Sequence, residues 1–223
     1  MKRRIKIKLI NLIIPLGIIL MSWTLLKYST EKEKSYLSPI PQNEINEIIL
    51  KGHLLINDGF SEILEVKQIY QNRAEDYWSD DIMLSEGDTI SASGCLLTSF
   101  TMLRNYFDNT EDTPCDVNAI LNKSACPFNF LDASKKYNYS YDGYIKCANL
   151  KAYKSAIVYY LSCGTPVIIQ LSGRNNISHF VLSVGYSSEG IIINDTDIYT
   201  NHRFLNQYLD DGYTITKLHI LKK

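Results

Sequence analysis

The sequence has no excess of charge of either sign. Its 223 residues include 23 lysines and arginines and 24 aspartates and glutamates, which gives a net charge of −1 at pH 7. A nucleic-acid-binding protein normally concentrates positive charge on one face, so we expect no nucleic-acid partner. Hydrophobic residues make up 45% of the chain, a share that excludes an intrinsically disordered protein and suits a folded domain.

Sequence motifs for metals and nucleotides are also missing. No two cysteines have the C-x-x-C spacing, and no cysteine and histidine are spaced as zinc ligands usually are. The P-loop pattern of ATP-binding domains, G-x-x-x-x-G-K-S/T, does not occur either. The sequence therefore predicts neither a metal nor a cofactor.

Cysteine is scarce and odd in number. The five cysteines are Cys95, Cys115, Cys126, Cys147 and Cys163. In an exported protein they are compatible with two disulfides and one free, reactive thiol. The alternative is that none is paired, because not every exported protein meets an oxidising catalyst.

The hydrophobic N-terminal stretch lacks both charge and a cleavage site. Residues 9–26 carry no charged side chain and would span about 27 Å as a helix, close to the thickness of a hydrocarbon core. Basic residues precede this stretch, which predicts a cytoplasmic N-terminus and an exported remainder. We expect residues 1–28 to be an uncleaved membrane anchor of a single-pass protein whose folded part is extracellular. The alternative is a cleaved signal peptide and a secreted protein.

The rest of the chain divides into a linker and one globular domain. Residues 29–61 begin as a polar, proline-broken linker and include a stretch, 43–52, whose helical periodicity ends on a glycine. Residues 43–61 are also a candidate propeptide. The domain is expected to cover residues 62–223 and to begin with a strand at 62–71, where apolar and polar residues alternate.

Helices come first in this domain and strands come last. Helical patterns begin near Cys95 and recur in residues 113–124, 128–138 and 149–164. Four apolar, β-branched runs separated by Gly, Asn and Ser then follow between residues 165 and 221, as in a meander of strands. This order predicts an α+β fold in which an N-terminal helical half packs on a C-terminal antiparallel sheet.

A glycine–cysteine pair stands at the start of the first helical stretch. Cys95 follows Gly94 and precedes apolar residues at helical spacing, among them Leu96, Phe100 and Leu103. The N-terminal end of a helix stabilises an anion, so a thiol there is a candidate nucleophile. The alternative is a small residue buried in the first turn of a core helix, and partners for the thiol are needed to decide.

One histidine and one strand end supply those partners. Among the four histidines only His179 opens a predicted strand, and the next strand ends in Asn194 and Asp195. If the two strands pair antiparallel across their short turn, Asp195 returns beside His179. With Cys95 these residues give the nucleophile, base and orienting group of a thiol enzyme. Asn194 is an alternative orienting group.

The same segments, taken in order, resemble the papain-like cysteine peptidases related to bacteriocin leader processing. The resemblance is carried by Gln71 seven residues before Trp78, S-G-C-L-L at 93–97, G-T-P-V-I-I at 164–169, S-H-F-V-L-S-V-G-Y at 178–186 and I-N-D-T at 193–196. It covers roughly residues 62–221 and implies a papain-like fold with the nucleophile at a helix start.

The resemblance also implies roles for single residues. It makes Cys95 the nucleophile, His179 the base, Asp195 the residue that orients this base, and Gln71 a donor to the oxyanion. Gln68 is a nearby alternative to Gln71. Thr196 departs from the family, which usually has proline there; we expect little chemical cost, because proline shapes the turn and carries no proton.

The activity implied is hydrolysis of peptide bonds in a peptide or protein substrate outside the cytoplasm. Specificity for paired glycines is not carried over, because relatives with that specificity are usually fused to a transporter and no P-loop occurs here. One alternative is a cysteine-dependent cell-wall amidase or endopeptidase, although S-A-S-G-C-L-L lacks the nucleophile motifs of those families. A catalytically silent binding module on the membrane surface and an acyl transferase are further alternatives.

Overall fold

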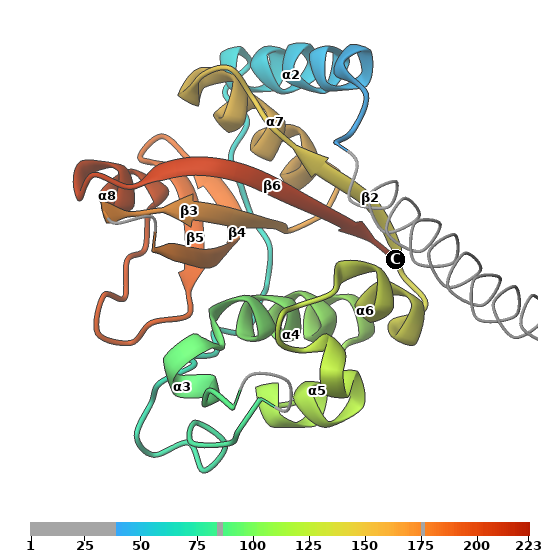
Figure 1. Cartoon of the computed structure of the whole chain (residues 1–223). Helices are drawn as coiled ribbons and strands as arrows, with labels where there is room; N and C mark the ends of the chain where they lie inside the picture. The colour runs from blue at the N-terminus through green and yellow to red at the C-terminus, as the bar shows by residue number, and fades with distance from the viewer. Residues whose placement is uncertain (1–38, 84–86, 175–176) are drawn as a thin grey trace, which may run out of the picture. The chain divides into compact units, whose positions relative to one another are not determined.

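The computed structural model describes residues 39–83, 87–174 and 177–223 (Figure 1). Its helices are α2 (Gln42–Asn57), α3 (Ile90–Ser93), α4 (Cys95–Asp108), α5 (Pro114–Leu121), the 3-10 helix η1 (Asn122–Ser124), α6 (Phe130–Tyr137), α7 (Leu150–Ser162) and α8 (Leu205–Asp210). Its strands are β1 (Glu62–Ile63), β2 (Ser140–Ile145), β3 (Val167–Ser172), β4 (Ser178–Ser187), β5 (Gly190–Asp195) and β6 (Thr214–Lys222). The chain is thus mixed helix and antiparallel sheet, which confirms the predicted α+β class.

The predicted membrane anchor, residues 1–28, lies outside the described residues. Within the ranges that are described, no helix has both the length and the apolar character needed to cross a bilayer. Residues 39–223 form one compact unit.

All strands belong to one antiparallel sheet. Its order is β1-β4-β3-β6-β2, and β5 pairs with β4. The predicted meander is right for β3, β4 and β5, which follow one another in the sequence and pair in that order. It is wrong for β6, which pairs with β3 and β2 rather than with β5. The sheet therefore also includes β2, a strand from the helical half that the sequence pattern does not predict.

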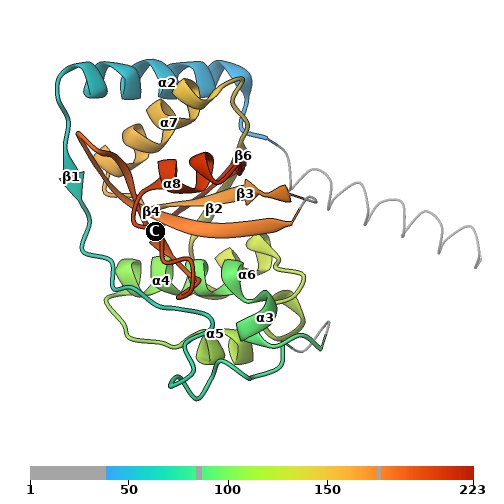
Figure 2. The same cartoon turned by 90° about the vertical axis from the view of Figure 1, so that its left-hand side faces the viewer.

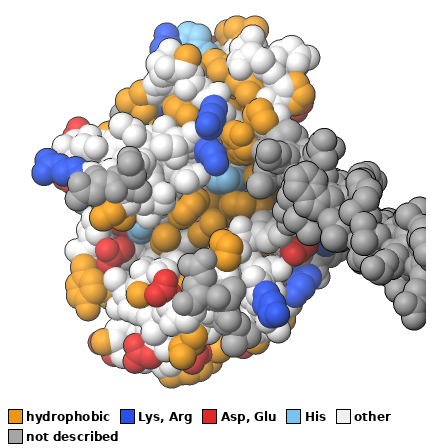
Figure 3. All heavy atoms as spheres, viewed as in Figure 1, with side chains coloured by type: hydrophobic (Ala, Val, Ile, Leu, Met, Phe, Trp, Pro, Cys, Tyr) orange, Lys and Arg blue, Asp and Glu red, His pale blue; other side chains and the backbone are white. Residues whose placement is uncertain are grey.

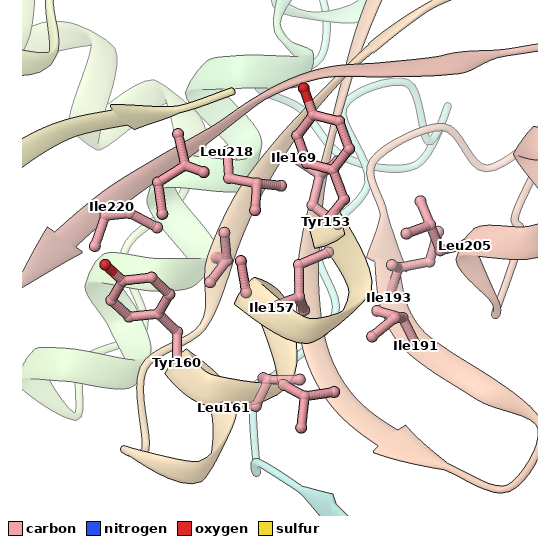
Figure 4. Packing of buried hydrophobic residues seen from close by; sticks show 14 of the residues in the cluster. Tyr153, Ile157, Tyr160, Leu161, Ile169, Ile191, Ile193, Leu205, Leu218 and Ile220 are labelled. Carbon is pink, nitrogen blue, oxygen red and sulfur yellow. The ribbon is translucent and has the colours of Figure 1, made fainter. Parts of the chain in front are cut away.

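Helices cover both faces of this sheet. Figures 1 and 2 show α2 and α7 on one face and α3, α4, α5 and α6 on the other. The predicted two-layer packing is therefore incomplete, because α7 lies across the sheet from α4. Two buried clusters fill the space between these layers, and Figure 4 shows Ile157 and Leu161 of α7 packed against sheet residues such as Ile169.

Side chains of β3 point alternately to two covered faces of the sheet, which explains the continuous run of apolar residues in this strand. Val167 and Ile169 belong to the cluster under α7, whereas Ile168 belongs to the cluster over α4. Successive side chains of a strand point to opposite faces, so a strand covered on both faces needs apolar residues at every position. All three residues are fully buried.

The predicted strand over residues 62–71 is wrong beyond its first two residues. Glu62 and Ile63 pair with β4, and the chain then leaves the sheet. Leu64 still belongs to the cluster under α7, but Ile69 packs on the cluster around α4. The segment therefore passes around the sheet edge from one layer to the other, which an alternating pattern does not reveal.

The helix predicted to end on Gly52 continues to Asn57. A Cβ at position 52 would lie 1.8 Å from the carbonyl oxygen of Ser155 in α7, so the glycine permits close contact between two helices and does not end one. Helix α2 packs on α7, on the face of the sheet opposite α4. It does not cover the end of α4, where a propeptide over residues 43–61 would be needed to mask Cys95.

Candidate active site

Cys95 is the first residue of α4, and the buried side of that helix fixes its position. Leu97, Phe100 and Leu103 are fully buried in the cluster between α4 and the sheet. Cys95 itself is half-buried. The alternative of a wholly buried cysteine is therefore excluded, and the thiol lies at the helix end where N–H groups lack intrahelical acceptors.

Gly94 joins α3 to α4 directly before the thiol. Its φ of −83° is open to any residue, so the backbone does not require glycine. The space does, because a Cβ would lie 2.4 Å from the carbonyl oxygen of Ile90 and 2.7 Å from its Cγ2 atom. The glycine thus allows α3 to fold tightly against the start of α4.

His179 lies near the start of β4, with its ring half-buried. The strand pairs His179 with Leu171 of β3, which fixes its backbone within the sheet. Its Nε2 donates to Asp195 Oδ1 at 3.0 Å. The Cys95 side chain is also a neighbour of this ring, close enough to raise the pKa of the imidazole. Since Nε2 is occupied by Asp195, Nδ1 is the nitrogen left for the sulfur.

Asp195 and Asn194, the two candidates at the end of β5, point in different directions. β5 pairs with β4, with Asp195 opposite Val181, two residues beyond His179. The Asp195 carboxylate meets His179, whereas Asn194 Nδ2 donates to the carbonyl oxygen of Val66 at 3.0 Å. Successive side chains on a strand face opposite ways, so only one of the two can reach the imidazole.

The buried Asp195 carboxylate receives four hydrogen bonds. Oδ1 accepts from His179 Nε2 and from the backbone N–H of Asp197 (3.1 Å). Oδ2 accepts from the Tyr208 hydroxyl (2.7 Å) and from the backbone N–H of His202 (3.0 Å). Its side chain is fully buried, and a buried carboxylate is tolerated only when its oxygens are satisfied in this way.

These neighbours decide the charge of His179. Burial is the largest single effect and lowers the pKa of its imidazole. The hydrogen bond with Asp195 and the electrostatic effects of Cys95 and Asp195 outweigh burial and raise the pKa to about 9. The ring is therefore mostly protonated near neutral pH.

Gln71 and Gln68 are both near this site, with different hydrogen bonds. Gln71 Nε2 donates to the carbonyl oxygen of Ser91 in α3 at 3.0 Å, four residues before Cys95. Gln68 Nε2 donates instead to the carbonyl oxygens of Asp195 (2.5 Å) and Ile69 (2.9 Å). Gln71 is therefore the glutamine tied to the segment that carries the nucleophile.

Two residues that contact the site were missed by sequence reasoning. Tyr208, fully buried in α8, bonds to Asp195, and Thr196 bonds to Gln71 Oε1 at 3.0 Å. Residues 205–210 carry no long helical pattern, so nothing signalled a helix there. Thr196 was noticed only as a departure from the family pattern.

The other three histidines have different surroundings. His219 is buried and stacked on Phe130 with ring centroids 4.2 Å apart, and burial and then Lys217 lower its pKa to about 3. His202 Nε2 pairs with Asp211 at 2.8 Å, and His53 lies on α2. No group of His, Cys, Asp and Glu in the described ranges has the arrangement of a metal site.

Cys115, Cys147 and Cys163 carry free thiols, as does Cys95. No disulfide joins any two of these four cysteines. Burial, with Asp81 as a further cause at Cys115, raises the pKa of the Cys115 and Cys147 thiols to about 11. Cys163 is exposed at the end of α7. It is the natural control for the reactivity of Cys95.

The surface on the side shown in Figure 1 is not dominated by one charge. Figure 3 shows acidic and basic side chains interspersed on this side, with hydrophobic side chains gathered toward its middle.

One family of known proteins resembles this chain. The model of the Peptidase_C39 like family matches residues 63–215. That range contains all four residues of the site, Gln71, Cys95, His179 and Asp195. No curated protein matches the chain. No solved structure matches it either.

Proposed function

Because the chain belongs to the Peptidase_C39-like family, we propose that it is a cysteine peptidase that hydrolyses peptide bonds through Cys95, His179 and Asp195. The observation that carries the proposal is the position of one ring. His179 bonds to the Asp195 carboxylate through Nε2, and the Cys95 side chain is a second neighbour of the same ring. This arrangement supports the proposal, because thiol catalysis needs nucleophile, base and orienting group beside one another.

The reaction follows from the charges of these groups. The Cys95 sulfur, as a thiolate, attacks the carbonyl carbon of the substrate and forms a carbon–sulfur bond. The protonated His179 ring then gives its proton to the leaving amine as the carbon–nitrogen bond breaks. The now neutral ring takes a proton from water as the water oxygen attacks the acyl carbon. The carbon–sulfur bond then breaks, which releases the acid and restores the thiolate and the protonated ring. Asp195 keeps the ring in one orientation throughout.

Gln71 is proposed as the side-chain donor to the oxyanion. Its Nε2 carries two hydrogens, and one of them is used by Ser91 O. The other has no acceptor among the described residues, so it is available to a substrate oxygen. The backbone N–H of Cys95, at the start of α4, is the proposed second donor.

The place of action is a further part of the proposal. The basic and apolar composition of residues 1–28 supports a membrane anchor with the peptidase outside the cytoplasm. Protease added to intact cells should degrade residues 39–223, provided that a cytoplasmic marker survives. Resistance in intact cells together with degradation after lysis would contradict this location. Recovery of a shortened chain from the medium would instead indicate signal-peptide cleavage.

A peptide library tests the activity. The wild-type chain should release peptides whose ends map to defined bonds by mass spectrometry, and Cys95→Ala should release none. Cys163→Ser, which removes an exposed thiol away from the site, should match the wild type. Equal cleavage by wild type and Cys95→Ala would refute the proposal. Cleavage of purified peptidoglycan but of no peptide would favour the cell-wall alternative.

A further inference from the structure

Gln71 and Thr196 are held together at two points. The backbone N–H of Gln71 donates to the carbonyl oxygen of Thr196 at 2.7 Å. The Thr196 hydroxyl donates to Gln71 Oε1 at 3.0 Å. Gln71 is 7% exposed and Thr196 is fully buried, so water does not compete at this contact. It joins the segment before α3 to the residue that directly follows Asp195.

The side-chain amide of Gln71 has two orientations of nearly the same shape. In one, the NH₂ group faces Ser91 O and has a second N–H to spare. In the other, Oε1 faces Ser91 O, so that two acceptors meet and no N–H is presented on that side. Only the first orientation can supply a donor to an oxyanion.

We propose that Thr196 is a positioning residue that fixes the Gln71 amide in its donating orientation. The hydroxyl donates to Oε1 on one side, and Ser91 O accepts from Nε2 on the other. Both hydrogen bonds are possible only when the amide is in its donating orientation. This inference rests on the proposed peptidase function, because the orientation matters only if Gln71 serves an oxyanion.

The family's usual proline would retain only half of this contact. A proline at position 196 still has a carbonyl oxygen for the Gln71 N–H, but it has no hydroxyl for Oε1. The proposal thus gives the residue at position 196 a role beyond shaping a turn. A purely structural role remains the rival, because the same hydroxyl lies 3.3 Å from the carbonyl oxygen of Phe180.

Matched variants of Thr196 separate the two roles. Thr196→Val keeps the shape and removes the donor, and should lower kcat about tenfold with little change in KM. Thr196→Ser restores the donor and should recover most of kcat. Thr101→Val is the control: its hydroxyl is also buried and donates to a carbonyl, that of Leu97 at 2.8 Å, and kcat should stay unchanged.

The Gln71→Ala background makes the test decisive. If Thr196 acts through Gln71, adding Thr196→Val to Gln71→Ala lowers kcat no further. If the tenfold loss recurs in that background, the hydroxyl acts through Phe180 or the fold, and the proposal is overturned.

A readout without substrate distinguishes failure of this inference from failure of the proposed function. In the full-length ¹⁵N-labelled chain, the Gln71 side-chain NH₂ signals are identified by their loss in Gln71→Ala. The N–H that bonds to Ser91 O should exchange slowly with water in wild type and Thr196→Ser, and faster in Thr196→Val. Unchanged exchange in Thr196→Val overturns the positioning role, whether or not any peptide is cleaved. Absence of Cys95-dependent cleavage refutes only the proposed function.

Discussion

The Tyr208 hydroxyl donates to Asp195 Oδ2 at 2.7 Å, on the carboxylate oxygen that His179 does not use. The Tyr208 ring also lies beside that of His179, with centroids 5.3 Å apart. One side chain of α8 thus contacts two members of the site. The position of this short helix therefore helps to set the direction in which the carboxylate presents Oδ1 to the imidazole.

Replacing Tyr208 by Phe should slow catalysis more than it weakens the fold. The change removes one of four donors to a buried carboxylate, and should destabilise the chain by about 1 kcal/mol. The carboxylate can then rotate away from His179, so kcat should fall by about tenfold. Tyr153→Phe is the control, since that hydroxyl donates to Thr216 O at 3.1 Å on the α7 face. Steady-state kinetics and urea unfolding of both variants test this; an equal kcat in both would contradict it.

The dependence of activity on pH should reflect the protonation of His179. Its pKa of about 9 lies above the value of about 6.5 for a free imidazole, so folding favours the charged ring. The corresponding stability is fully present below pH of about 6.5 and is lost as pH rises through about 9. The peptidase rate should fall over the same alkaline range, because a neutral ring cannot protonate the leaving amine.

Asp195→Asn should move this alkaline limb to lower pH. The variant removes the charge and the carboxylate hydrogen bond that oppose burial, so the His179 pKa should drop. The control is Asp211→Asn, which removes a carboxylate bonded to His202 and should leave the limb in place. The measurement is kcat/KM across the neutral and alkaline range. An unchanged limb in Asp195→Asn would show that another group titrates there.

Gly52→Ala should destabilise the chain although alanine favours helix. The added Cβ meets the Ser155 carbonyl oxygen of α7 at 1.8 Å, so α2 must shift away from α7. We expect a net loss of about 2 kcal/mol in unfolding free energy, against near zero for Leu54→Ala on the exposed side of α2. Urea unfolding measures both. Because α2 lies across the sheet from Cys95, kcat of the folded variant should be retained; a stability equal to wild type would refute the contact.

The parts of the site that sequence could predict are those with a local pattern. Cys95 is marked by a glycine before it and an apolar helix after it. His179 and Asp195 lie on adjacent strands joined by a short turn, so their contact follows from pairing alone. The choice between Asp195 and Asn194 needed only one further fact, the face of β5 on which each side chain lies.

The parts that sequence could not predict depend on contacts between distant segments. Tyr208 and Thr196 meet Asp195 and Gln71 only after α8 and the segment before α3 are placed on the sheet. Gly52 was interpreted as a helix end because its reason, the backbone of α7, lies about a hundred residues further along the chain. The pattern of residues 62–71 predicts a strand because apolar and polar side chains also alternate in a segment that crosses from one layer to the other.

The position of β6 bears on how the chain folds during synthesis. β6 follows every other strand in the sequence, yet it lies between β3 and β2, and β2 has β6 as its neighbour in the sheet. Until β6 has been made, β2 lacks its partner strand among the described residues and the edge of β3 that β6 covers is open. Such late, long-range pairing slows folding. The thiol, imidazole and carboxylate are thus all synthesised before the sheet that positions them is complete. The site can therefore reach its final geometry only after β6 has been synthesised.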